Sequence, residues 1–258
     1  MADEVLFERR GHIAWITLNR PHVHNAMNPD LMRQLREAFL AFRQERELRV
    51  AVVTGAGDRA FSAGADLKGL ARRAPQDFLQ EFWYSSERGQ PECWKPVIAA
   101  INGYCYAAAM NLVSTTCDIR IASEQATFCY AEVLRGFSGY AASVAVLPRQ
   151  IPYALALEWL MTGRVVDAQE AYRAGYVCEV VPHQRLLARA QEVAEQVAAL
   201  APLATRAVKE SAWRALNLDV PRAIRMAAAI GTLSRLTEDA REGPRAFAEK
   251  RAPQYRGR

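Results

Sequence analysis

Cysteine and histidine are scarce in this chain of 258 residues, which contains five cysteines and four histidines. No Cys-x-x-Cys pair occurs, and the first four cysteines are twelve residues apart, a spacing that matches no zinc site. Five is too small and odd a number for a disulfide framework. We therefore expect no metal site, and we interpret the cysteines as small buried residues.

Long hydrophobic runs and blocks of charge are also missing. No run approaches the roughly 18 apolar residues of a membrane span, and the start, MADEV, lacks the features of a signal peptide. The 33 Lys and Arg residues against 28 Asp and Glu give a net charge of +5 that is spread along the chain. A nucleic-acid-binding protein would concentrate its cations on one face or tail. We expect a cytoplasmic protein that binds neither membrane nor nucleic acid.

The composition is that of a folded protein, because 51% of the residues are hydrophobic and 24% are charged. Residues 5–9 and 12–19 form alternating runs that predict a hairpin, and Asn28 precedes a helical pattern that is expected to end near Glu47. Further strands that are covered on both faces are predicted at 50–54, 96–101 and 119–122. Strands that alternate with helices predict an α/β fold with a mostly parallel sheet.

After about Pro148 the pattern becomes helical, with one short apolar run at 177–181. The alanine-rich faces of these helices suit packing against another subunit. Helices are predicted at 154–161, 168–174, 184–200, 204–216 and 223–235.

Two loops combine small residues with the start of a helix. The segment 61–68, FSAGADLK, and the segment 102–113, NGYCYAAAMNLV, each follow a predicted buried strand. Small residues let a ligand approach the backbone, and the first N–H groups of a helix are unpaired donors. At neighbouring strand ends such donors could together hold an oxyanion. An ordinary strand-to-helix turn capped by Asp66 is the alternative for the first segment.

The chain resembles the crotonase superfamily of enoyl-CoA hydratases and isomerases over essentially its whole length. Each matching stretch is weak alone, but together they follow the order of the family. They are NRPH (19–22) with HNAM (24–27), FSAGADL (61–67), KPVIAAING (95–103), CDIRIA (117–122), LMTGR (160–164), and EDAREG (238–243) with AFAEKR (246–251).

The resemblance implies an α/β fold built as a spiral of ββα turns, with a helical trimerisation region and commonly a hexamer of two stacked trimers. It divides the chain into a core at 1–195 and a C-terminal oligomerisation region at 196–258. It places the two oxyanion-hole N–H groups on Ala65 and Ala108, against the thioester oxygen of an acyl-CoA. No cofactor is required, since the coenzyme A thioester is the substrate.

The resemblance also implies positions along the coenzyme A path. Phe247 and Lys250 would approach the nucleotide, either within one chain or from a neighbouring subunit. A solvated charge on a helix face is the alternative for Lys250. The loop residues on the path are Ser62, Ala63, Gly64, Asp66 and Leu67.

Family hydratases use two glutamates that share a water molecule. Glu132, in the motif FCYAEV, matches the second of them, although a surface glutamate on a turn is the alternative. The first is missing. Counted from Gly103 its position is Asn111, and counted from Asp118 it is Leu112, because this stretch is one residue longer than the family spacing.

The same shift would move the second oxyanion donor from Ala108 toward Ala109. The family has three glycines where this chain has alanines at 107–109. An alanine keeps its N–H donor, provided that the backbone needs no positive φ. Asparagine at position 111 could hold a water molecule but has no useful pKa, so it cannot act as a general base. Losing a positioned acid or base typically costs about 10²–10⁴-fold in rate.

Tyr140 lies where some relatives carry a second acid, so it could donate a proton or cover the acyl pocket, but packing is the simpler role.

We expect an acyl-CoA enzyme of the hydratase/isomerase family with Glu132 as acid/base. Hydratase is the family expectation, whereas a single carboxylate suits a double-bond isomerase, a thioester hydrolase or a decarboxylase. A non-catalytic acyl-CoA-binding protein is the alternative from another class.

Overall fold

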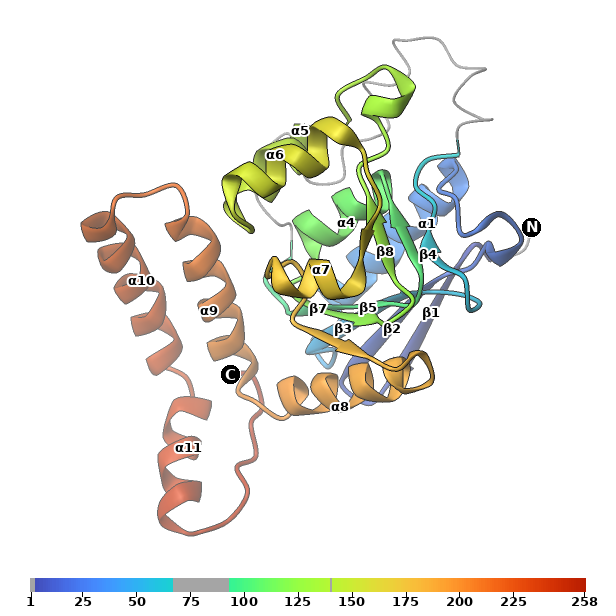
Figure 1. Cartoon of the computed structure of the whole chain (residues 1–258). Coiled ribbons are helices and arrows are strands. Elements are labelled where there is room, and N and C mark those ends of the chain that lie inside the picture. The colour runs from blue at the N-terminus through green and yellow to red at the C-terminus, as the bar shows by residue number, and fades with distance from the viewer. Residues whose placement is uncertain (1–2, 67–92, 140) are drawn as a thin grey trace.

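The computed structural model describes residues 3–66, 93–139 and 141–258 (Figure 1). The expected site residues Leu67 and Tyr140 lie outside these residues, as does the helix expected after Asp66. In the described part of the chain no helix is long and apolar enough to cross a membrane.

A six-stranded sheet forms the centre of the fold, in the order β1-β2-β3-β5-β7-β10. The pair β1 and β2 is antiparallel and every other neighbouring pair is parallel, which confirms the predicted hairpin and the mostly parallel sheet. The strands are β1 (Val5–Arg10), β2 (Ile13–Leu18), β3 (Val50–Gly55), β5 (Val97–Ile101), β7 (Ile119–Ser123) and β10 (Glu179–Val181).

Both faces of this sheet are buried, because successive side chains of a strand point to opposite faces and here both sets are apolar. Trp15 and Val52 pack under α8 (Leu186–Ala198), whereas Ile16 and Val53 belong to the larger core on the other face. Figure 1 shows α8 on one side of the sheet and α1 (Pro29–Gln44) and α4 (Ala108–Thr116) on the other.

Helix α1 begins as the sequence predicts, since the Asn28 side chain accepts a hydrogen bond from the Leu31 N–H at 2.8 Å. It ends at Gln44 rather than near Glu47. The buried Lys95 ammonium donates to the carbonyls of Phe42 and Glu45, each at 2.6 Å. A cation from a distant segment therefore satisfies carbonyls at the end of this helix.

A second, four-stranded sheet has the order β4-β6-β8-β9 and was not predicted from the sequence. Its strands have only two or three residues, which is too short for an alternating pattern. Each of β4, β6 and β8 directly follows a strand of the large sheet, and β6 leads into α4, as expected for a ββα turn. They are β4 (Ala60–Ser62), β6 (Tyr104–Tyr106), β8 (Thr127–Cys129) and β9 (Val166–Asp167).

Glycine is required where the chain passes from one sheet to the other. A Cβ atom on Gly55 would lie 2.3 Å from the Ala60 carbonyl oxygen, and one on Gly103 would lie 2.1 Å from that of Arg59. The Asn102 side chain donates to the Gly55 carbonyl at 3.0 Å. The Asn-Gly pair therefore ties the ends of neighbouring strands together.

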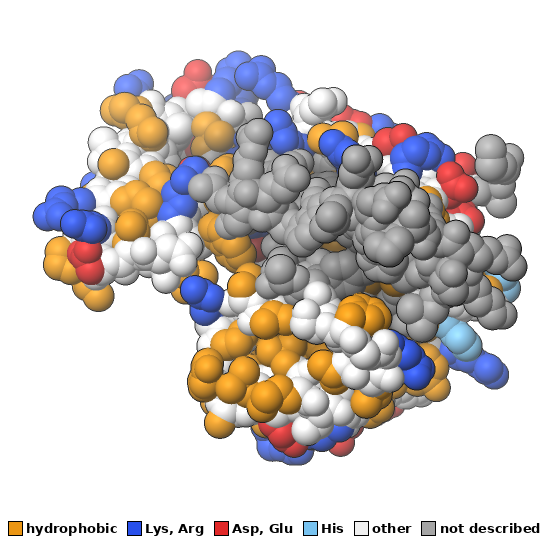
Figure 2. Space-filling model, turned by 90° about the horizontal axis from the view of Figure 1, so that it is seen from above, with side chains coloured by type: hydrophobic (Ala, Val, Ile, Leu, Met, Phe, Trp, Pro, Cys, Tyr) orange, Lys and Arg blue, Asp and Glu red, His pale blue; other side chains and the backbone are white. Residues whose placement is uncertain are grey.

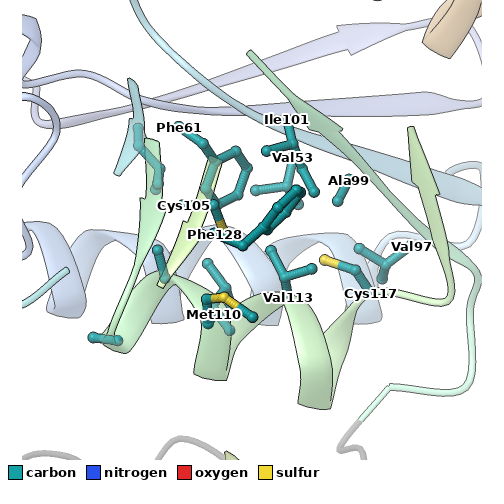
Figure 3. Close-up of a cluster of buried hydrophobic side chains, with 14 of the residues drawn as sticks. Val53, Phe61, Val97, Ala99, Ile101, Cys105, Met110, Val113, Cys117 and Phe128 are labelled. Atoms are coloured by element: carbon teal, nitrogen blue, oxygen red, sulfur yellow. The ribbon is translucent and has the colours of Figure 1, made fainter. Parts of the chain in front are cut away.

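The core between the two sheets and α4 contains aromatic and sulfur-bearing side chains. Figure 3 shows Phe61, Cys105 and Phe128 of the small sheet facing Val53 and Ile101 of the large one, with Met110 and Val113 of α4 beside them. Cys93, Cys105, Cys117 and Cys129 are buried, as predicted, but Cys178 is exposed. The interpretation of all five cysteines as buried residues is thus wrong for Cys178, which lies one residue before β10.

Helices α6 to α10 follow the predicted order with small differences at their ends, whereas α5 and α11 are not among the helices predicted from the pattern. The short apolar run at 177–181 forms β10 in its second half. The helices are α5 (Ala141–Val146), α6 (Tyr153–Thr162), α7 (Ala168–Arg173), α9 (Pro202–Ala215), α10 (Val220–Arg235) and α11 (Asp239–Ala248).

Helices α9, α10 and α11 extend away from the two sheets (Figure 1). No residue of α10 is buried, and several large apolar side chains of α9 and α10 are largely exposed: Val208, Val220, Ile224 and Leu233. Hydrophobic side chains also gather on the face seen in Figure 2. Exposed apolar surface of this extent is typical of a chain that packs against other chains.

Candidate active site

The loop after β4 carries the first expected oxyanion donor. It is held by Met27, whose N–H donates to the Gly64 carbonyl at 2.8 Å and whose carbonyl accepts from the Asp66 N–H at 3.0 Å. This parallel bridge uses the backbone groups on either side of Ala65. Within residues 3–66 and the other described ranges, the Ala65 N–H has no acceptor, so it is free to bind a ligand.

Residues of the motif HNAM form hydrogen bonds to the segments around this loop. Asn25 is fully buried, and its side chain donates to the carbonyls of Ala56 at 3.0 Å and Ala60 at 2.8 Å. His24 accepts from the Ala63 N–H through its carbonyl at 2.9 Å. His24 and Asn25 both adopt positive φ, at 54° and 55°. The motif therefore fixes the path of the chain before and after β4.

The second expected donor lies at the start of α4. The Ala107 N–H donates to the Cys129 carbonyl at 2.8 Å, and Ala108 is the first residue of the helix. No described residue accepts a hydrogen bond from the Ala108 N–H. A short strand, β6, precedes this turn. The strand-to-helix junction expected from the sequence pattern is therefore wrong, and the order is the strand, strand, helix that the family resemblance implies.

The two loops are in contact. A Cβ atom on Gly64 would lie 2.7 Å from the Tyr106 carbonyl oxygen and 3.3 Å from the Ala108 nitrogen. Gly64 itself has a φ of 90°, which L side chains rarely adopt. Only glycine thus lets the Ala65 loop approach the Ala108 turn, and Gly64 packs beside the Ala108 nitrogen.

Ala107 adopts φ 51° and ψ −115°, a conformation that ordinarily requires glycine. On the expectation from the sequence, alanine replaces glycine at 107–109 without cost only where φ is negative. Ala107 does not meet this condition. It holds at Ala108 and Ala109, which lie inside α4. The chain accepts strain at one residue and keeps the donor on the next one.

Glu132 lies three residues after β8, where it precedes a short 3₁₀ helix (Val133–Arg135). Only 3% of the residue is exposed, and neither carboxylate oxygen has a hydrogen-bond partner in the described part of the chain. Burial raises the pKa of this carboxyl above its ordinary value. The alternative interpretation of Glu132 as a surface glutamate on a turn is therefore wrong.

Gly139 packs directly on this carboxylate. A Cβ atom on Gly139 would lie 3.1 Å from the Glu132 Cδ atom, and the residue has a φ of 77°. A side chain at position 139 would press on Glu132. A buried, unpaired carboxylate with a raised pKa is a candidate acid/base, because structural carboxylates are normally paired.

The two candidate positions for the missing glutamate have different surroundings. Asn111 is half-buried, and its Oδ1 atom accepts a hydrogen bond from the Ser143 hydroxyl at 2.8 Å. Leu112 is buried and belongs to the hydrophobic core. Asn111 thus presents a polar group, whereas Leu112 contributes to packing.

Several residues expected on the coenzyme A path shape the loop in this structure. The Ser62 hydroxyl is buried and accepts from the Gly64 N–H at 3.1 Å. Asp66 forms an ion pair with Arg20 at 3.3 Å. Ser62 and Asp66 therefore hold the shape of this loop, in which Gly64 is buried and Ala63 is half-buried.

Phe247 and Lys250 are not brought to this site by the chain itself. Figure 1 shows α11 at the end of the molecule away from β4. Phe247 is 87% exposed, and Lys250 lies two residues after the end of α11 with a φ of 52°. Glu242, on the same helix, forms an ion pair with Arg251 at 2.6 Å. These two residues could reach an acyl-CoA only from another copy of the chain.

Two residues at this site had no role in the sequence-based prediction. Gly139 and Ser143 both lie in the segment after Glu132, and neither belongs to a motif with a recognisable spacing. The positive φ of Gly139 and the hydrogen bond of Ser143 are properties of the folded chain. Among the described residues no group of three His, Cys, Asp or Glu side chains could hold a metal ion.

Comparison with known proteins identifies the family of the chain. The sequence model of the family described as enoyl-CoA hydratase/isomerase matches residues 8–258. The chain belongs to this family. It is 38% identical to (E)-benzylidenesuccinyl-CoA hydratase of Thauera aromatica, over 98% of this chain and 99% of the relative. It is 40% identical to carnitinyl-CoA dehydratase of Citrobacter koseri, with both chains covered completely.

Solved structures confirm the fold of this family member. The crystal structure of an enoyl-CoA hydratase from Bacillus anthracis superposes with a TM-score of 0.94 at 33% identity, covering 99% of this chain and 100% of that one. An enoyl-CoA hydratase/isomerase from Mycobacterium paratuberculosis gives 0.89 at 38% identity, with 99% of each chain covered. The predicted α/β spiral of the crotonase family is therefore correct.

Proposed function

We propose that this family member catalyses the reversible hydration of a 2-enoyl-CoA thioester, with Glu132 as the single acid/base. The observation that carries the proposal is the buried Glu132 carboxylate, which has no partner in the described part of the chain. The names of the relatives support a reaction that adds or removes water: one is a hydratase and another a dehydratase.

The Ala65 and Ala108 N–H groups would supply the electrostatic half of the reaction. When water attacks the β-carbon of the 2-enoyl group, negative charge moves to the thioester oxygen. Two main-chain donors aimed at this oxygen stabilise the enolate, and each such donor is worth roughly 3–4 kcal/mol in the transition state. Because both donors belong to the backbone, replacing the family's glycines by alanines leaves them in place.

Glu132 would supply the proton transfers. Its carboxylate takes a proton from the attacking water as the water oxygen bonds to the β-carbon. The protonated Glu132 then returns this proton to the α-carbon, and the enolate collapses to the saturated thioester. Burial raises the pKa of Glu132 above its ordinary value, and this makes its carboxylate a stronger base for the proton of the attacking water.

A second candidate reaction is the isomerisation of a 3-enoyl to a 2-enoyl thioester. It is favoured by the residues at the two candidate positions of the first family glutamate, Asn111 counted from Gly103 and Leu112 counted from Asp118, because neither can ionise. Isomerisation needs only one carboxylate, because the proton removed from one carbon is returned to another. Thioester hydrolysis and decarboxylation would use the same oxyanion donors.

Binding of the coenzyme A nucleotide and assembly belong to the same proposal. We expect a homotrimer or a hexamer in which Phe247 and Lys250 of one subunit approach the nucleotide held by its neighbour. The exposure of Phe247 on α11 and of Lys250 just after it supports this arrangement. An apolar groove of about 790 Å³ between α9 and the core, lined in part by Leu200, Val208 and Trp213, offers further surface for subunit packing. No resident cofactor is needed.

Purified protein mixed with crotonyl-CoA tests the reaction, because hydration removes the absorbance of the conjugated thioester. We expect Glu132→Gln to lower kcat by about 10²–10⁴-fold, as the loss of a positioned acid/base does. The Kd for coenzyme A should stay within a few-fold of the wild-type value. The matched control is Glu124→Gln, because Glu124 is exposed on the turn after β7.

The outcome decides between the candidate functions. Wild-type turnover in Glu132→Gln would show that another group is the acid/base. Conversion of a 3-enoyl-CoA without hydration of crotonyl-CoA would favour the isomerase. Tight binding of several acyl-CoA esters with no turnover of any enoyl-CoA would identify a non-catalytic binding protein.

A further inference from the structure

Asn111 is held by a buried hydroxyl group that no motif predicts. Ser143, on α5, is 1% exposed and donates to the Asn111 Oδ1 atom at 2.8 Å. No described residue accepts a hydrogen bond from the Asn111 Nδ2 group. The amide oxygen is therefore occupied inside the protein, and the amide NH₂ group is available to a ligand.

The hydroxyl of Ser143 is the donor of this hydrogen bond, because an amide oxygen can only accept. Ser143 also stands at the end of a row of buried hydroxyls. The Tyr176 hydroxyl lies 2.9 Å from the Ser114 hydroxyl, which lies 3.1 Å from that of Tyr130, and Tyr130 in turn interacts with Ser143. This row surrounds Ser143 with polar partners inside the protein.

A single short segment connects Asn111 with Glu132. Gly139 packs on the Glu132 side chain, and Ser143, four residues later, contacts Asn111. The turn before α4 is also bonded to the end of β8, through the Ala107 N–H and the Cys129 carbonyl. The amide NH₂ of Asn111 and the carboxylate of Glu132 thus belong to the same small region, one as a donor and the other as an acceptor.

We propose that Ser143 is a positioning residue that fixes the Asn111 amide as a hydrogen-bond donor for the oxygen atom added to, or removed from, the β-carbon of the acyl group. This inference rests on the proposed function. Asn111 would hold the water or hydroxyl oxygen without exchanging a proton with it, and Glu132 would perform every proton transfer. Such a pair favours acyl groups that carry an oxygen on the β-carbon over saturated ones.

Binding measurements test this pair without relying on turnover. The Glu132→Gln variant serves as the background, and isothermal titration gives its Kd for butyryl-CoA and for each enantiomer of 3-hydroxybutyryl-CoA. The ratio of the two Kd values measures how strongly the site recognises the β-oxygen. We expect about a fivefold preference for one hydroxy enantiomer, the contribution of one typical hydrogen bond.

In that background Asn111→Ala should remove the preference, and Ser143→Ala should reduce it at least twofold while the Kd for butyryl-CoA stays unchanged. Adding Ser143→Ala to Asn111→Ala should have no further effect, because the serine acts only through the amide. Ser123→Ala is the matched control, since Ser123 is also buried but bonds to His183. It should leave the preference intact.

Three results would overturn the pair. They are an undiminished preference in Ser143→Ala, the absence of any preference in the Glu132→Gln background, and an equal effect of Ser143→Ala with and without Asn111. A parallel loss of butyryl-CoA affinity would indicate a structural role for Ser143 and would also reject the proposal. Failure of the proposed function is seen separately, as wild-type turnover by Glu132→Gln.

Discussion

The strained turn before α4 allows a quantitative prediction about stability. Ala107 has φ 51° and ψ −115°, a region that costs a residue with a Cβ atom about 1–3 kcal/mol. The Ala107→Gly substitution removes this strain. It also increases the freedom of the unfolded chain, which costs about 0.5–1 kcal/mol. We expect a net gain of about 1 kcal/mol in the free energy of unfolding.

The matched control is Ala109→Gly, the same chemical change two residues later. Ala109 is helical and fully buried. Glycine there costs about 1 kcal/mol in helix propensity and up to about 0.8 kcal/mol for the lost methyl group. The two variants should therefore differ in sign, with a separation of about 2–3 kcal/mol.

Urea denaturation of the three proteins at one fixed concentration measures these differences, since assembly would make stability depend on concentration. An Ala107→Gly variant that loses as much stability as Ala109→Gly would refute the argument from backbone strain. It would mean that the Ala107 methyl group contributes more by packing than its conformation costs.

Two further predictions concern the residues around the proposed oxyanion donors and the acid/base. Gly64→Ala should abolish turnover of crotonyl-CoA, because the new Cβ atom would lie 2.7 Å from the Tyr106 carbonyl oxygen and would separate the two loops; near wild-type kcat would contradict this. Burial raises the pKa of Glu132 above its ordinary value of 4.5, so the native state binds the proton more tightly than the unfolded state. The stabilisation from protonated Glu132 is fully present below pH 4.5 and is lost as the pH rises through the pKa of the folded state. The free energy of unfolding of Glu132→Gln, measured in urea, should therefore increase relative to wild type over this pH range. A difference between the two proteins that does not change with pH would contradict this prediction.

The long elements of the fold could be predicted because their sequence signals are local. The all-apolar runs of β3 and β5 identify strands covered on both faces, and Asn28 marks the start of α1. The end of α1 could not be predicted in the same way. It depends on Lys95, which lies about fifty residues further along the chain and reaches the helix only after folding.

The small sheet and the exposed cysteine were missed for related reasons. A strand of three residues such as β6 has no periodicity to detect, and its position depends on the clash-free passage at Gly103. Cys178 lies in an apolar stretch of sequence, as the buried cysteines do, but in the structure it is exposed just before β10. Side-chain exposure there is decided by the path of the backbone and cannot be read from the residue type.

The residues of the candidate site could be predicted from local sequence signals, whereas the contacts between distant residues could not. Ala65, Ala108 and Glu132 could be named from motifs because the family resemblance covers the residues on both sides of each. The orientation of the Asn111 amide could not, since it depends on Ser143, thirty-two residues later in the chain. Motifs therefore indicate which residues form the site, whereas the hydrogen bonds indicate which of their atoms remain available.

Main-chain and side-chain groups respond differently to substitution, and this difference explains how the site can depart from the family pattern. An N–H donor survives the exchange of glycine for alanine at the cost of strain at Ala107. A carboxylate does not survive its exchange for an amide, since the amide keeps hydrogen bonding but loses proton transfer. In the function that we propose, the backbone donors therefore retain oxyanion stabilisation, Glu132 performs the proton transfers, and Asn111 acts as a fixed donor.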